Sequence, residues 1–61
     1  MSLEQRTLLF ARLRQDPVLS KKVLDAENLN GLPAAAAIAK EAGYDVDTAD
    51  MADIIYGPDS I

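Results

Sequence analysis

The corner around Gly43 constrains the fold more than any other part of the chain, because a helix end, a short apolar turn and a new helix start can all be read there. Gly43 stands where a helix ends with a residue in the left-handed region, which glycine adopts without steric cost. Tyr44 and Val46 alternate with a charged residue and are predicted to point inward. Asp47 or Thr48 then caps a last helix. Helices are therefore expected on both sides of this corner.

Further signals divide the preceding chain into helices. Asp16-Pro17 predicts a helix start, because the aspartate caps free backbone N–H groups and proline is harmless at the first helical position. Residues 27–31 contain two asparagines and end in glycine, so they are expected to form a loop. Leu32-Pro33 then opens a third helix.

Apolar residues recur at helical spacing in the predicted helices. Leu9, Phe10 and Leu13 lie on one side of the first helix. Because the turn after this helix is brief, the first two helices are expected to be antiparallel. In the third helix, Leu32 and Ile38 are expected to supply most of the burial. The alanine run between them would let another backbone approach closely.

Size and composition leave helix packing as the source of stability. The chain has 61 residues and contains neither cysteine nor histidine, so no disulfide or Cys/His metal site supports it. A fold of this size buries only about 60% of the surface that its unfolded chain exposes. We therefore predict an all-α fold, a small bundle of three to four short helices with a flexible C-terminal tail, of marginal stability without a partner.

The same composition argues against catalysis and metal binding. Without histidine and cysteine, the chain lacks the commonest general base and the thiol nucleophile. So small a core hardly encloses the roughly 300 Å³ that a ligand pocket requires. The aspartates of residues 45–53 lack the spacing of a calcium loop. We expect no enzyme, no metal and no cofactor in this chain.

The net charge of −4 is unevenly distributed. Residues 1–40 carry six basic and four acidic side chains, whereas residues 41–61 carry six acidic and no basic ones. The acidic half disfavours nucleic acid, whose phosphates bind cations. No apolar run reaches the ~20 residues that span a bilayer, and the N-terminus lacks a secretion signal. We therefore expect a cytoplasmic protein that binds neither nucleic acid nor membranes.

Two blocks carry a family resemblance. Residues 9–23 contain an apolar pair, a basic residue, an apolar residue, then Asp-x-x-Leu and a lysine followed by an apolar residue. Residues 37–46 end in the pattern Ala-x-x-Ala-Gly-aromatic-x-aliphatic. This combination resembles the Nif-eleven-type (nitrogen-fixation-associated) leaders of ribosomally synthesised, post-translationally modified peptide precursors. The resemblance implies that residues of both blocks pack the leader or meet its partner: Leu9, Phe10, Leu13, Asp16, Leu19, Val23, Ile38, Ala42, Gly43, Tyr44 and Val46.

Such leaders are recognised by a maturation enzyme that alters a core segment attached downstream. The resemblance thus implies a precursor peptide that is acted upon. A folded leader can be bound once while the attached segment samples the active site at high effective concentration. No Gly-Gly or Gly-Ala pair follows the leader, and without cysteine no thioether ring can form. Either the core lies beyond this chain, or the brief tail is the core.

The tail contains a second resemblance. Ile55-Tyr56-Gly57 resembles the X-Tyr-Gly site at which spliceases, radical S-adenosylmethionine enzymes, excise a tyramine unit and leave an α-keto-β-amino acid. The implied partners are such an enzyme, carrying an iron-sulfur cluster and S-adenosylmethionine, and a small leader-binding protein. Glycine at the third position leaves the backbone open to close approach. A simpler interpretation makes Tyr56 the end of the last helix and Gly57 its stop.

These interpretations divide the chain into a helical leader domain, residues 1–53, and a flexible core or substrate tail, residues 54–61. The alternative is a small helical adaptor that binds a protein partner and is not itself modified. The tail discriminates between the two, because an adaptor should keep its role without the tail, whereas a precursor should lose its product.

Overall fold

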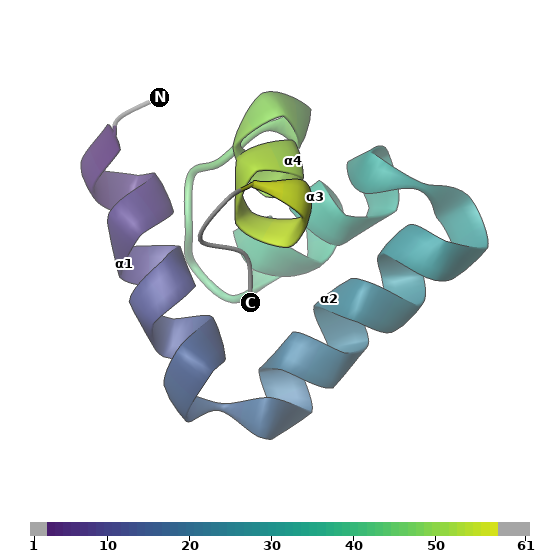
Figure 1. The fold of residues 1–61 in the computed structure, drawn as a ribbon, viewed down its shortest axis with the longest axis horizontal. Coiled ribbons are helices and arrows are strands. Elements are labelled where there is room, and N and C mark those ends of the chain that lie inside the picture. The colour runs from purple at the N-terminus through teal and green to yellow at the C-terminus, as the bar shows by residue number, and fades with distance from the viewer. Residues whose placement is uncertain (1–2, 58–61) are drawn as a thin grey trace.

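Four α-helices make up the fold in the computed structural model, which describes residues 3–57 (Figure 1). The helices are α1 (Leu3–Gln15), α2 (Pro17–Asn30), α3 (Leu32–Glu41) and α4 (Thr48–Tyr56). No strand occurs in this part of the chain, so the predicted all-α class is confirmed. The helices α1 and α2 diverge as a V from their junction, and α4 lies across its mouth with α3 (Figure 1). The helices α1 and α2 therefore do not form the expected antiparallel pair.

The junction between α1 and α2 forms as the sequence predicts. Asp16 caps α2 by accepting a hydrogen bond from the backbone N–H of Leu19 at 3.1 Å, and Pro17 occupies the first helical position. The Nε of Arg12, one turn earlier, donates to the other carboxylate oxygen of Asp16 at 3.2 Å. One aspartate therefore both starts α2 and binds the end of α1.

The prediction of a loop at residues 27–31 is wrong. Helix α2 continues to Asn30, and Gly31 alone separates it from α3. Gly31 has φ 86° and ψ −174°, a conformation essentially confined to glycine, and its N–H donates to the carbonyl of Glu27 at 2.8 Å. This one residue turns the chain sharply enough for α2 and α3 to pack on each other. That packing outweighs the weak helix propensity of the asparagines.

The core is built around α4 and the small residues of α3. Leu9, Val23 and Met51 are fully buried, with Ile54 at 2% exposure. In α3 the buried residues are alanines rather than the expected Leu32 and Ile38, which are only partly covered. Small side chains let α3 lie close to its neighbours, and the longer ones stay at the edge. The buried alanines are Ala35, Ala36 and Ala39.

The corner between α3 and α4 follows the prediction closely. Gly43 has φ 100°, and the N–H of Tyr44 donates to the carbonyl of Ala39 at 3.1 Å, as in a glycine-terminated helix end. Val46 is 1% exposed, whereas Tyr44 is half-buried. Asp47 caps α4, because its carboxylate accepts the N–H of Asp50 at 3.1 Å.

The end of α4 lies within residues 54–61, the segment expected to form the tail. The helix continues through Tyr56 and ends at Gly57, as the simpler interpretation of these two residues predicted, and Ile54 belongs to the core. The apolar face of α4 explains why the helix continues beyond Ile54, since one more turn lets Ile55 be partly buried against the core. Residues 58–61 of the expected tail lie outside the described residues.

Neighbouring leucines on α1 provide a test of the core. Leu9 is fully buried and Leu8 is 48% exposed. We expect Leu9→Ala to lower the free energy of unfolding by about 2–5 kcal/mol, a large part of the roughly 3–9 kcal/mol of a domain this size. The control Leu8→Ala should stay within about 0.5 kcal/mol. Urea denaturation followed by circular dichroism measures both, and equal losses would contradict this core.

Acid should weaken the caps of α2 and α4. The N–H of Leu19, followed by Arg12, lowers the pKa of Asp16, and the N–H of Asp50 lowers the pKa of Asp47. A carboxyl group whose pKa is lowered by folding stabilises the folded state at pH values above its ordinary pKa of about 3.9. This stabilisation is lost as the pH falls through the folded-state pKa. We therefore expect the free energy of unfolding to decrease once the pH is lowered beyond about 4.

The matched control for this pH dependence is Asp47→Asn, since asparagine also caps helices but does not titrate. Urea denaturation between pH 7 and pH 3 should give a shallower decline for the variant than for the parent chain. Identical slopes would mean that the Asp47 cap does not contribute to the acid sensitivity.

Candidate functional site

The residues implied in leader recognition separate into a buried and an accessible group. Leu9, Leu13, Val23 and Val46 belong to the core and are at most 3% exposed, so they stabilise the domain and are not available to a partner. The remaining positions are partly or fully accessible: Phe10, Asp16, Leu19, Ile38, Ala42, Gly43 and Tyr44.

Three of the accessible residues meet in one groove between α2 and α3. Leu19 comes from the first sequence block, and Ile38 and Ala42 come from the second. Lys22 and Glu41 line the same groove, which has a volume of about 370 Å³. An apolar floor with one cation and one anion beside it suits an apolar side chain of a protein partner. The structure thus brings the two blocks together on the surface as well as in the core.

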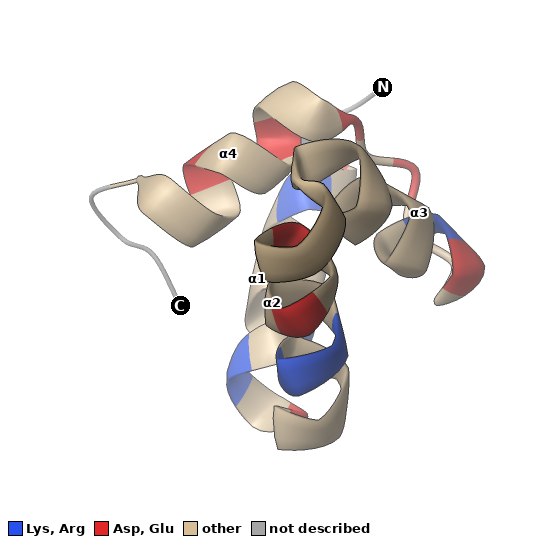
Figure 2. Ribbon diagram, turned by 90° about the vertical axis from the view of Figure 1, so that its right-hand side faces the viewer, with Lys and Arg blue, Asp and Glu red and all other residues tan. Residues whose placement is uncertain are grey.

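Most cations gather where α1 meets α2, and acidic residues mark α4 and the loop before it (Figure 2). A second groove of about 580 Å³ lies at this basic end, between Leu13 and Arg14 of α1 and Leu24 of α2. Lys21 lines it and pairs with Asp25 at 3.7 Å. The charge asymmetry seen in the sequence is therefore also an asymmetry in space.

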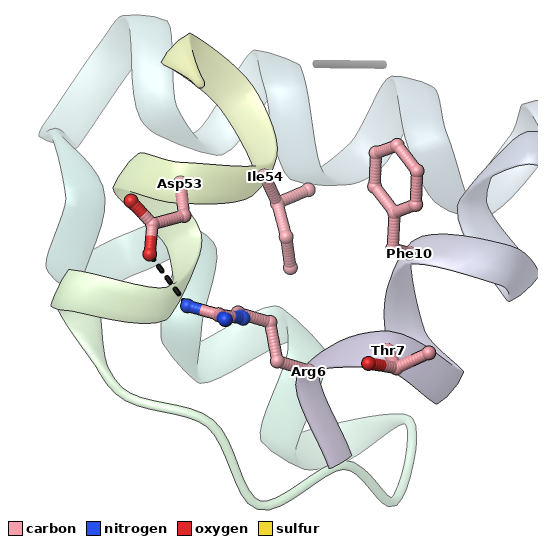
Figure 3. A pocket seen from close by; sticks show the side chains of 5 residues that line it. All are labelled: Arg6, Thr7, Phe10, Asp53 and Ile54. Atoms are coloured by element: carbon pink, nitrogen blue, oxygen red, sulfur yellow. Dashed lines mark hydrogen bonds and ion pairs between the residues drawn. The ribbon is translucent and has the colours of Figure 1, made fainter. Parts of the chain in front are cut away.

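A small pocket lies between α1 and α4 (Figure 3). Phe10 and Ile54 supply its apolar sides, while Arg6 reaches across to Asp53, with 2.6 Å between Nη1 and Oδ2. Its volume of about 190 Å³ is below the roughly 300 Å³ typical of small-molecule sites. This pocket is better described as a gap in the packing of α4 than as a ligand site.

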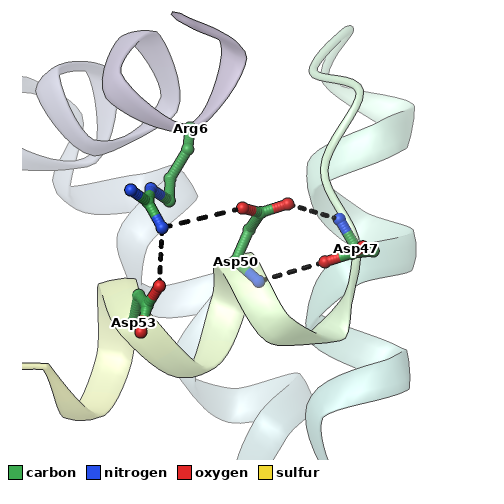
Figure 4. Close-up of polar contacts among 4 residues, drawn as sticks. All are labelled: Arg6, Asp47, Asp50 and Asp53. Atoms are coloured by element: carbon green, nitrogen blue, oxygen red, sulfur yellow. Dashed lines mark hydrogen bonds and ion pairs between the residues drawn. The ribbon is translucent and has the colours of Figure 1, made fainter. Parts of the chain in front are cut away.

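Polar contacts join α1 to the first turns of α4 (Figure 4). Asp47 and Asp50 each accept the other's backbone N–H at 3.1 Å, a reciprocal capping box. Asp50 is the one buried charged residue in the described part of the chain, at 5% exposure, and its other oxygen lies 4.0 Å from Nη1 of Arg6. Arg6 thus faces two carboxylates of α4.

The expected modification site lies at the end of α4. Ile55 is partly buried against the core, and Tyr56 is 63% exposed. The Tyr56 hydroxyl donates a hydrogen bond to Oε1 of Glu27 on α2. The N–H of Gly57 donates to the carbonyl of Asp53 at 3.0 Å, and a Cβ at Gly57 would collide with that carbonyl oxygen. Glycine is therefore required here for structural reasons too.

Sequence reasoning missed the roles of Arg6 and Glu27. Arg6 had no role assigned to it from the sequence and Glu27 was expected in a loop, yet both side chains contact α4. The Arg6 and Asp53 positions are 47 residues apart, and Glu27 and Tyr56 are 29 apart. No local pattern encodes pairs of such separation, because they arise only when the helices are packed.

Other classes of site find no support in the described residues. Across residues 3–57, no group of three or more His, Cys, Asp or Glu side chains is arranged to hold a metal ion. The helices described are also too short and too polar to cross a bilayer.

Comparison with known proteins agrees with the geometry of the two blocks. Residues 1–51 match the family profile described as the Nif11 domain. No curated protein and no solved structure matches the chain significantly. The matched region includes both sequence blocks, the groove that they form and the glycine corner before α4. The chain therefore belongs to the Nif11 domain family, a family of precursor-peptide leaders and not of enzymes.

Proposed function

We propose that this chain is the precursor peptide of a modified peptide natural product, with residues 1–53 as leader and residues 54–61 as the substrate segment. The position of Ile55-Tyr56-Gly57 carries this proposal, because the tripeptide follows shortly after the family domain, which ends at residue 51. It also stands at the end of the last helix, where the Tyr56 side chain is 63% exposed.

In the proposed reaction a radical S-adenosylmethionine splicease acts on Tyr56. The bond between the Ile55 carbonyl carbon and the Tyr56 nitrogen breaks, as does the bond between Cα and the carbonyl carbon of Tyr56. The two carbonyl carbons become joined, so that Ile55 becomes the α-keto-β-amino acid. The nitrogen, Cα and side chain of Tyr56 leave as a tyramine-derived unit. The enzyme's iron-sulfur cluster and S-adenosylmethionine supply the radical, and this chain supplies only the substrate.

We assign recognition of the leader to the groove between α2 and α3. Its apolar floor of Leu19, Ile38 and Ala42 is accessible, and it is formed by both sequence blocks. A small leader-binding protein that inserts an apolar side chain there would bury surface that the free chain leaves exposed. Residues of α4 do not line this groove, so a partner bound there does not cover the modification site.

The splicing reaction predicts a defined change of mass. Co-expression with a splicease should lower the intact mass of the chain by the nitrogen, Cα and side chain of one tyrosine. Tyr56→Phe should abolish this tyramine-sized loss, and Tyr44→Phe, which changes the other tyrosine, should retain it. Tyr56→Phe is a cleaner test than Gly57→Ala, because a Cβ at Gly57 disturbs the helix end. An unchanged mass of the parent chain would refute splicing.

The same variant distinguishes the precursor from an unmodified adaptor. A precursor with Tyr56→Phe should still bind its partner through the leader but yield no product. An adaptor with this variant should keep both its binding and its cellular role.

The recognition groove predicts different effects for two exposed alanines. Ala42 lines the groove, whereas Ala37 is exposed on α3 outside it. Ala42→Arg should weaken binding to the leader-binding protein by about tenfold or more, because a charge replaces an apolar contact. Ala37→Arg should change the affinity by less than about twofold. Titration calorimetry measures both, with circular dichroism to verify folding, and equal affinities would place recognition elsewhere.

A further inference from the structure

All three residues of the proposed modification site belong to the folded end of α4. Ile55 and Tyr56 are helical, and the N–H of Gly57 caps the helix by donating to the carbonyl of Asp53 at 3.0 Å. The bonds that the reaction would break lie in the backbone between Ile55 and Gly57. A helical backbone is wound on itself, so an enzyme that acts on these bonds needs the last turn to open.

The last turn is attached to a helix that otherwise contacts α4 little. α4 packs mainly on α3 and α1, and its extensive contacts do not include α2. The hydrogen bond from the Tyr56 hydroxyl to Glu27 nevertheless joins the end of α4 to α2. Glu27 is partly buried and lies one turn before Gly31, whose N–H donates to the Glu27 carbonyl at 2.8 Å. Its backbone position is therefore held within helix α2.

The turn of α4 before Ile55 is held in place by the core. Ile54 is 2% exposed and Met51 is fully buried, so these residues are held by the core and not by the end of the helix. Opening can therefore stop after Ile54, with loss of the partial burial of Ile55, of the Gly57 cap and of the Tyr56 contact. Helix ends that depend on so few contacts open locally without global unfolding.

We propose that Glu27 and Tyr56 form a latch that holds Ile55-Tyr56-Gly57 in a closed helical turn, and that Glu27 thereby controls access to the modification site. The significance of the latch rests on the proposed function, whereas the latch itself is a property of the free chain. Glu27 acts through Tyr56 and is a positioning residue, since it contributes no reacting atom.

Hydrogen exchange of the free chain tests the latch without any enzyme. In Glu27→Ala, the amides of Ile55, Tyr56 and Gly57 should exchange about threefold to tenfold faster than in the parent chain, by loss of one side-chain hydrogen bond. The Met51 amide, which donates to Asp47 at 3.1 Å, serves as the internal reference for global opening and should be unaffected. The control Asn28→Ala changes the adjacent exposed position of α2 and should leave all four rates unchanged.

A double variant separates the latch from general weakening of α2. Tyr56→Phe should accelerate exchange at Ile55 and Gly57 to the same extent as Glu27→Ala, and the combination should add little to either. Unchanged exchange in Glu27→Ala, or fully additive effects, would overturn the latch.

A second readout separates failure of the latch from failure of the proposed function. With a splicease present, Glu27→Ala should be modified about threefold to tenfold faster than the parent chain if opening limits the rate. Faster exchange without any loss of mass would leave the latch in place and refute the splicing reaction. Loss of mass with unchanged exchange would support splicing and refute the latch.

Discussion

The burial of the apolar face of α4 is the interaction on which the rest of the structure depends. The helices α1 and α2 diverge from Asp16 as a V, so they cover little of each other, and α3 packs mainly on α2 (Figure 1). Met51 and Ile54 of α4 fill the space that remains, beside Leu9 of α1. The ion pair between Arg6 and Asp53 adds a polar contact at the rim. Without α4, α1 would be attached to the domain mainly through its junction with α2.

This arrangement gives one helix two tasks. The first turns of α4 complete the core of the leader, and its last turn carries the residues proposed as the substrate. The leader and the substrate segment are consequently not separated by a linker within residues 3–57. Access to Tyr56 is then a matter of local helix stability, which few contacts determine. The core residues Met51 and Ile54 limit how far such opening spreads toward the leader.

The proposed recognition groove and the proposed modification site lie on different elements of the same small domain. The groove that we assign to the leader-binding partner belongs to α2 and α3, and the reacting backbone belongs to the end of α4. Helix α2 contributes to both, through Leu19 and Lys22 in the groove and through Glu27 at Tyr56. A domain that holds its substrate segment close to a bound partner keeps the effective concentration of that segment high. The proposed modification site is thus presented on a helix end and not inside a pocket.

The helix boundaries at residues 16 and 43 were predictable, since they depend on local chemistry. Asp16 caps its own helix and Gly43 adopts a backbone angle that other residues avoid, and both effects act within a few residues. The family was recognisable for a related reason, because its two blocks are contiguous in the sequence. The five-residue loop predicted before the third helix was not found, because α2 and α3 pack together and Gly31 alone connects them. Local sequence patterns do not contain this packing.

What the amino-acid sequence determined by itself is the all-α class, the order of the helices, most of their starts and ends, and the membership of the family. The tertiary structure decided which residues of each helix are buried and how α1 and α2 diverge. It also paired Arg6 with Asp53 and Glu27 with Tyr56, which no local pattern indicated. The physical reason is range: caps and turns act over a few residues, whereas burial and ion pairs between helices exist only after distant segments have packed.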